Sequence, residues 1–266
     1  MMPYPIYIEH GEEKQVELEI PDSIPLGMVY VPAGSFFSGG EESRFYRKHR
    51  HVLPGFFIKK HEVTFSEYLE FWENLAEPRL KQAFKSRVRF HADKRTFTDA
   101  WDLDGQLLDE RLQLNHPVVG VTLDAAKAFC EWKSIQTGTA IRLPTAEEWE
   151  KAARGVDGRK YVWGDGFGSE GNLTLTQTSA TGGTQQFLRA AQGKFPRDLT
   201  VYNAYDMAGN VRELTTSKLP GSDTLYQIKG GSGATPPTFL PCCYSSDTPV
   251  VPSDVGFRYI QEMSKE

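Results

Sequence analysis

The chain has 266 residues, of which 39% are hydrophobic and 24% are charged, and its formal net charge is −5. This composition is typical of a soluble, mildly acidic globular protein, and the basic residues are too scattered to predict a nucleic-acid partner. No apolar run approaches the ~20 residues of a membrane span, so we expect no membrane insertion by this chain. Three cysteines, Cys130, Cys242 and Cys243, make no disulfide framework and favour a reducing, cytoplasmic compartment.

The first residues differ in pattern from the rest of the chain. Polar and apolar residues alternate at 15–20, which predicts a half-buried strand, and Pro21 with Pro25 then terminates it. We interpret residues 1–25 as the last strand of a preceding module with its linker. Residues 26–262 are then predicted to form one domain, a usual size for a mixed or all-β fold.

The first half of this domain predicts short strands and one helix. Two strands joined by a Pro-Ala-Gly turn are expected at 28–37, and a third at 56–63. Thr64 begins a helix whose aromatic face is more simply core than a cofactor site. From 76 to 115 the chain is polar, charged and weakly periodic, so we expect a surface excursion with a hairpin turn at 102–105.

A strand and two helices are predicted next. The strand covers 116–121, and Thr122 then caps the first helix. The second helix opens with a capping box between Thr145 and Glu148 and ends at Gly155. Beyond Gly155 the chain is rich in loops, and an irregular body of this kind favours stabilisation by bound metal.

The segment 202–213, Tyr-Asn-Ala-Tyr-Asp-Met-Ala-Gly-Asn-Val-Arg-Glu, contains the best candidate for a metal site. Asp206, Gly209, Val211 and Glu213 could present two carboxylates and two backbone carbonyls, the oxygen ligands that Ca2+ prefers. The central glycine tolerates the tight turn that such wrapping needs. On spacing alone, a solvated turn with an aspartate cap is the simpler interpretation.

Seven short motifs occur in a fixed order along the chain. They are Val-Pro-Ala-Gly-Ser-Phe at 31–36, His-Glu-Val-Thr-Phe-Ser-Glu-Tyr at 61–68, Pro-Val-Val-Gly-Val at 117–121, Arg-Leu-Pro-Thr-Ala-Glu-Glu-Trp-Glu-Lys-Ala-Ala-Arg-Gly at 142–155, Asp-Met-Ala-Gly-Asn-Val-Arg-Glu at 206–213, Gly-Gly-Ser at 230–232 and Gly-Phe-Arg at 256–258. In these motifs the chain resembles the formylglycine-generating enzyme (sulfatase-modifying factor) superfamily. The resemblance implies an α+β, C-type-lectin-like fold with little regular structure and long loops, stabilised by Ca2+.

The resemblance also assigns metal positions. It places Asp206, Gly209, Val211 and Glu213 on the calcium turn of the family. It matches Asn172 and Leu173 to the start of a second calcium site, whose downstream acidic ligand has no clear counterpart at 181–187.

The catalytic positions of the family are altered. Its catalytic members oxidise a substrate cysteine with Cu(I) and O2, and the resemblance places their two copper-binding cysteines at Thr235 and Leu240. Cu(I) is held by soft sulfur ligands, which neither residue provides, so we expect no copper and no oxidase activity. Ser232 is retained, whereas Gly233 replaces the family tryptophan.

We therefore expect a non-catalytic recognition domain of a larger bacterial protein. The motif order resembles modules that follow the catalytic domain in some bacterial serine/threonine kinases, although this chain has no kinase motif of its own. Short and varied side chains in the segment 232–254 favour a protein or peptide partner over a deep small-molecule pocket. The predicted binding residues are Ser232, Gly233, Thr235, Thr238, Phe239, Leu240, Cys242, Cys243 and Tyr244.

Two alternatives stay open. Residues 230–257 contain no Lys, Arg, Glu, Gln, Met or Trp, a composition that resembles the variable region of diversity-generating retroelement proteins, although a Pro- and Ser-rich loop is the simpler interpretation. In the other alternative, Cys242 and Cys243 bind copper in an active oxidase. Adjacent side chains of an extended strand point in opposite directions, which disfavours one ion between them.

Overall fold

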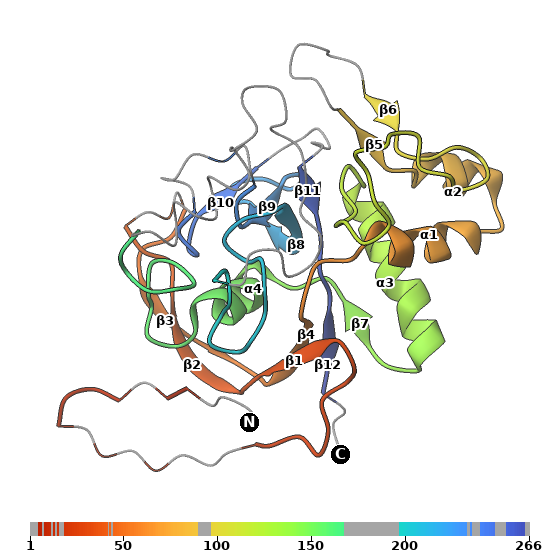
Figure 1. Cartoon of the computed structure of the whole chain (residues 1–266). Coiled ribbons are helices and arrows are strands. Elements are labelled where there is room, and N and C mark those ends of the chain that lie inside the picture. The colour runs from red at the N-terminus through yellow and green to blue at the C-terminus, as the bar shows by residue number, and fades with distance from the viewer. Residues whose placement is uncertain are drawn as a thin grey trace.

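A computed structural model gives the fold of this chain. It describes residues 5–6, 8–11, 13, 15, 19–41, 43, 45–89, 97–167, 197–232, 235, 240–247 and 254–263. Residues 16–18, the middle of the strand predicted at 15–20, lie outside these residues. The described part is a mixed α+β structure in which short strands and few helices are joined by long irregular segments (Figure 1). None of its helices has the length and apolar character needed to cross a membrane.

The first sheet is antiparallel and joins distant parts of the chain. Its four strands lie in the order β1-β4-β12-β7, and their bounds are Met28–Val31, Phe56–Lys59, Ile260–Glu262 and Ile141–Arg142. The late strand β12 is therefore central, with β4 on one side and β7 on the other.

The second sheet carries the candidate site. Its strands lie in the order β10-β9-β8-β11, with bounds Ser245–Ser246, Tyr226–Lys229, Arg212–Lys218 and Val255–Gly256. Strand β11 runs parallel to β8, with Val255 opposite Arg212 and Gly256 opposite Glu213. This pairing brings the segment just before β11 beside the turn that leads into β8.

Two small antiparallel sheets and four helices make up the rest of the regular structure in the described residues. Strand β2 (Gly34–Ser38) pairs with β3 (His49–Leu53), and β5 (Arg87–Val88) pairs with β6 (Thr98–Asp99). Helices α1, α2, α3 and α4 cover Phe65–Glu73, Pro78–Ala83, Leu123–Thr137 and Ala146–Arg154. Helices α1–α3 gather on one side of the body, at the right of Figure 1, whereas α4 contacts β2, β8 and β9.

The helices begin where their sequence signals predict. Thr64, Thr122 and Thr145 each accept a hydrogen bond from a backbone N–H of the first turn, and Thr64 and Thr145 form complete capping boxes. Gly155 ends α4, with its N–H bonded to the Lys151 carbonyl oxygen. These local signals confirm the predicted helix starts at all three threonines.

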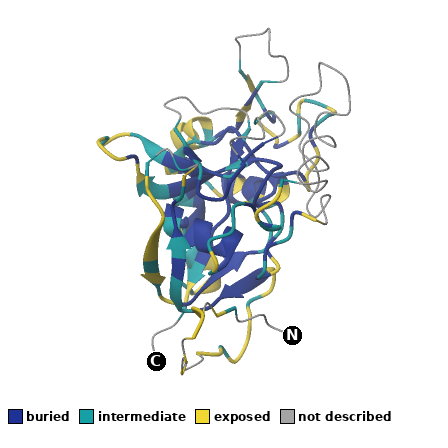
Figure 2. Cartoon of the chain, turned by 90° about the vertical axis from the view of Figure 1, so that its left-hand side faces the viewer, coloured by how far each residue is buried: buried dark blue, intermediate teal, exposed yellow. Residues whose placement is uncertain are grey.

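Among the described residues, two hydrophobic cores lie on opposite faces of the first sheet. One packs α1 and α3 around Tyr68, Phe129 and Phe257, and the other packs α4 around Trp149 against β1, β4 and β12. Figure 2 shows the buried residues gathered in the middle of the body, with exposed residues at its edges. The cores support the interior charges described below.

The strand prediction at 116–121 is wrong. The Val118 N–H donates a hydrogen bond to the Val63 carbonyl oxygen. The Gly120 N–H donates to the Val255 carbonyl oxygen, and the Gly120 carbonyl oxygen accepts from the backbone N–H of Arg87. The segment therefore bonds to three separate parts of the chain and pairs with none of them over a strand's length. Its valines are buried, so the apolar pattern identified core residues correctly.

The segment 76–115 is more structured than predicted. It contains α2, the β5–β6 pair and the fully buried Trp101, which packs edge-on against Phe65 and Trp72. Val88, Ala100 and Leu112 are buried with it, and residues spaced so irregularly give no periodic pattern in the sequence. The turn at 102–105 is confirmed, since the Asp102 carboxylate accepts two backbone N–H bonds within it.

Candidate functional site

The turn at 206–213 is buried and leads into β8. Asp206 and Asn210 adopt the left-handed backbone conformation, with φ of 60° and 64°. The carboxylate of Asp198 accepts hydrogen bonds from two backbone N–H groups of the turn at 2.9 to 3.0 Å. These bonds fix the path of the turn, which holds all four residues of the predicted calcium set.

Glu213, the last residue of this set, forms a fully buried ion pair with Arg258. The guanidinium Nε and Nη2 each donate to one carboxylate oxygen at 2.7 Å, and the indole N–H of Trp149 donates to Oε2 at 2.9 Å. Arg258 also donates to the carbonyl oxygens of Lys59 and Tyr205. One guanidinium therefore links the turn to both four-stranded sheets.

Acidic side chains exceed basic ones around this ion pair. Glu62, Asp198, Asp206 and Glu213 are all buried, and all four interact electrostatically with Arg258. Burial, reinforced by the charge of Asp206, raises the pKa of Asp198 to about 7 and holds the pKa of Glu62 well above its usual value. The interior therefore favours either retained protons or one more cation.

Calcium binding at this turn stays a prediction. In this arrangement both carboxylate oxygens of Glu213 are bound by Arg258, so Glu213 would have to exchange that partner to bind an ion. Within the described ranges, no three or more His, Cys, Asp or Glu side chains are grouped to hold a metal. Asn172 and Leu173 lie outside the described residues.

A second polar cluster lies where β8, β11 and the segment after β9 meet. The Ser232 hydroxyl donates to Asp254 Oδ2 at 2.7 Å, and the Ser232 N–H donates to the Thr235 hydroxyl at 2.8 Å. Arg212 donates to both Asp254 oxygens, at 3.1 and 2.8 Å. We call these four residues the Ser232 network; it ties together the two ends of the segment 232–254.

The network lies beside a close approach at Gly231. A β-carbon at Gly231 would collide with the Leu240 side chain and would lie 3.5 Å from the β-carbon of Thr235. Thr235 and Leu240 therefore converge over the same glycine, although four residues separate them. These are the two positions at which the family resemblance expects cysteines, and here a hydroxyl and an isobutyl group stand there instead.

The predicted binding residues lie at different depths. Ser232, Leu240, Cys242 and Cys243 are buried, whereas Thr235 and Tyr244 are partly exposed. Gly233, Thr238 and Phe239 fall outside the described residues. Burial raises the pKa of the Cys242 thiol to about 12, which keeps it protonated at neutral pH. Among the described members, Thr235 and Tyr244 are therefore the ones that reach the protein surface.

A profile of one protein family, described as the sulfatase-modifying factor enzyme 1-like domain, matches residues 18–263. The chain belongs to this family. It is 27% identical over 213 residues to the serine/threonine-protein kinase Pkn1 of Chlamydia trachomatis, which covers 79% of this chain and 30% of the kinase. It therefore spans less than a third of that relative's length.

Other family relatives include enzymes and an inactive homologue. The formylglycine-generating enzyme of Mycobacterium tuberculosis is 27% identical over 233 residues, 72% of this chain and 74% of the enzyme. The bovine inactive C-alpha-formylglycine-generating enzyme 2 is 32% identical over 141 residues, 46% of this chain and 40% of that protein.

Solved structures share the family fold at low sequence identity. Treponema denticola variable protein 1 superposes with a TM-score of 0.67 at 18% identity, over 93% of this chain and 99% of that one. PvdO from Pseudomonas aeruginosa superposes with a TM-score of 0.63 at 19% identity, over 89% and 94% of the two chains. These similarities show the fold alone.

Sequence analysis did not identify the partners of the predicted residues. Arg258 ends the Gly-Phe-Arg motif and Trp149 lies in a capped helix, so each had another explanation. The available signal was a charged residue inside an apolar C-terminal stretch, which must find a buried partner. Nothing in the spacing named Glu213 as that partner.

We expect Arg258→Met to lower the free energy of unfolding by about 3–5 kcal/mol, because Glu213 would stay buried without its ion-pair partner. Adding Glu213→Gln should recover part of that loss, since the uncompensated charge is then removed. Urea unfolding of the single and double variants measures both effects.

The control variant is Arg159→Met. Arg159 pairs with Asp157 at 2.7 Å, but both side chains are partly exposed, so the loss should stay below about 1 kcal/mol. Equal losses in the two arginine variants would show that the interior pair does not anchor the fold.

Proposed function

We propose that this chain is a non-catalytic recognition module of a larger bacterial protein. The observation that carries the proposal is the convergence of Thr235 and Leu240 over Gly231, because neither side chain can bind Cu(I). The similarity to an inactive enzyme homologue and to a protein kinase supports a role other than cysteine oxidation. Three buried cysteines, none of them in a disulfide, fit a cytoplasmic setting.

The binding surface in this proposal is the face built by 232–254. The Ser232 network holds both ends of this segment on the second sheet, so the face is presented from a fixed base. Its partner is a protein or peptide, since specificity would reside in a loop on a rigid scaffold. A link to a kinase rests on the similarity to Pkn1, of which this domain spans 30%.

A second candidate is a variable ligand-binding protein whose residues 230–257 are diversified. The shared fold of Treponema denticola variable protein 1 favours it only at the level of architecture. A nearly identical template repeat beside the coding region would support this candidate, and a genomic neighbourhood without one would remove it.

Recognition is tested by photo-crosslinking from the proposed face. We expect a photoreactive residue in place of Tyr244, which is partly exposed, to crosslink one specific partner in bacterial lysate. The control position is Ile135, which is 81% exposed on α3, at the opposite side of the body from β10 (Figure 1). The same products from both positions, or none from Tyr244, would count against the proposal.

The proposed absence of a copper site is tested by Cu(I) titration against a competing chelator. We expect the native chain to retain no stoichiometric Cu(I), and Thr235→Cys/Leu240→Cys to gain it, because the two side chains converge over Gly231. Each single cysteine variant is the matched control and should bind only weakly. Tight copper in the native chain, lost in Cys242→Ser/Cys243→Ser, would instead favour the oxidase alternative.

We also propose that Asp206, Gly209, Val211 and Glu213 bind one calcium ion that stabilises the module. The surplus of buried carboxylates around Arg258 supports this proposal, because an added cation would offset their charge. Calcium would stabilise the fold here and would take part in no reaction.

Calcium binding is tested by thermal unfolding. Excess Ca2+ should raise the melting temperature and EDTA should lower it, because a ligand of the native state stabilises that state by mass action. Asp206→Ala should abolish the difference between the two conditions, whereas Asp102→Ala, in the exposed turn at 102–105, should preserve it. If neither Ca2+ nor EDTA changes the melting temperature, the calcium proposal is wrong and Arg258 is the cation that balances these carboxylates.

A further inference from the structure

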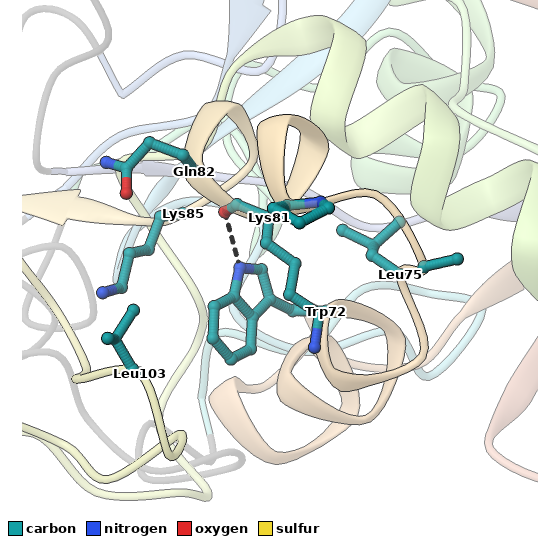
Figure 3. Close-up of a pocket in the computed structure, with 8 residues that line it drawn as sticks. Trp72, Leu75, Lys81, Gln82, Lys85 and Leu103 are labelled. Carbon is teal, nitrogen blue, oxygen red and sulfur yellow. Dashed lines mark hydrogen bonds between the residues drawn. The ribbon is translucent and has the colours of Figure 1, made fainter.

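A small pocket lies on the helical side of the molecule, away from the second sheet. It has a volume of about 260 Å3 and lies between the end of α1, helix α2 and the turn at 102–105. Figure 3 shows the principal lining residues, which are Trp72, Leu75, Lys81, Gln82, Lys85 and Leu103. Neither the sequence motifs nor the Ser232 network uses any of them.

The indole of Trp72 is fixed in place within this pocket. Its N–H donates to the Lys81 carbonyl oxygen at 2.7 Å, shown as the dashed line in Figure 3. Only 2% of the residue is exposed, and the ring packs against Trp101 with centroids 5.6 Å apart. In the same view Leu75 lies on one side of the ring and Leu103 on the other. The buried ring therefore forms a rigid base, and Leu75 and Leu103 provide the apolar surface that a ligand can reach.

Two ammonium groups border this apolar surface. Lys81 Nζ lies 5.1 Å and Lys85 Nζ lies 5.9 Å from the centre of the Trp72 ring. Lys85 also pairs with Asp99 at 3.2 Å, which offsets its charge. In the described part of the chain, Lys81 makes no ion pair with a carboxylate, so one positive charge at the pocket remains uncompensated.

The pocket offers apolar surface to a ligand at Leu103, which lines it and is 83% exposed. Burying this side chain under a ligand would remove apolar area from water. The pocket volume suits a group the size of one aromatic amino acid, and the single unpaired cation suits one negative charge.

We propose that this pocket binds a small aromatic or branched carboxylic acid, with its apolar group between Leu75 and Leu103, beside Trp72, and its carboxylate at Lys81. A monoanion fits better than a phosphate, because the leucine walls cannot solvate a second charge. The site is independent of the recognition face at 232–254, so each can fail without the other.

The probe is N-acetyl-L-phenylalanine, with N-acetyl-L-phenylalaninamide as the uncharged control. Binding is followed by NMR through the indole 1H–15N signal of Trp72, which is assigned by its loss in Trp72→Phe. We expect the acid to shift this signal saturably and the amide to bind about tenfold more weakly, since it cannot form the charge-assisted contact with Lys81.

Lysine variants separate charge from apolar contact. Lys81→Gln should weaken binding of the acid about tenfold and leave the amide unchanged. The matched control is Lys127→Gln, because Lys127 also places its ammonium 5.2 Å from an aromatic ring, that of Tyr226, but lies on α3. Asp99→Asn should tighten binding of the acid, because it leaves Lys85 without its carboxylate partner.

Three outcomes would overturn the proposal. If the acid and the amide bind equally, the pocket is merely apolar; if neither shifts the Trp72 signal, there is no site. If Lys81→Gln and Lys127→Gln weaken the acid equally, only the overall charge of the protein matters. The dispersion of the remaining NMR signals verifies that each variant is folded.

Discussion

The ion pair between Arg258 and Glu213 is the constraint on which the rest of the structure depends. A guanidinium in the interior is costly unless each of its donors has an acceptor, so its surroundings are tightly specified. Here the acceptors come from Glu213 at the start of β8, from Lys59 at the end of β4 and from Tyr205. Lys59 is far from Tyr205 and Glu213 in sequence, so this one guanidinium fixes the two four-stranded sheets to each other.

The same arrangement positions the Ser232 network. In the parallel pair of β11 with β8, Gly256 lies opposite Glu213 and Val255 lies opposite Arg212. Asp254, which comes just before Val255, is therefore close enough to accept hydrogen bonds from the Arg212 side chain. The scaffold and the proposed recognition face therefore share one short pair of strands. Loops outside that pair can differ in sequence without altering the base from which they project, which suits a fold reused for many partners.

Local signals in the sequence predicted local structure well. The caps at Thr64, Thr122 and Thr145 lie within a few residues of the bonds they form, and they located the three helix starts. The turn at 206–213 was located by spacing for the same reason. The partner of Glu213 lies 45 residues further along, and that distance hides it from any local pattern. The valines at 116–121 identified core positions, whereas their hydrogen-bond partners depend on tertiary structure.

The central position of β12 in the first sheet has a consequence for synthesis. Strands β1 and β4 are made early, but among the described strands β7 pairs in this sheet with β12 alone. The sheet therefore cannot close on the ribosome until residues 260–262 have left the exit tunnel, and Arg258 emerges only just before them. Until then Glu213 lacks the Arg258 guanidinium, and the early strands stay exposed to aggregation until β12 has emerged.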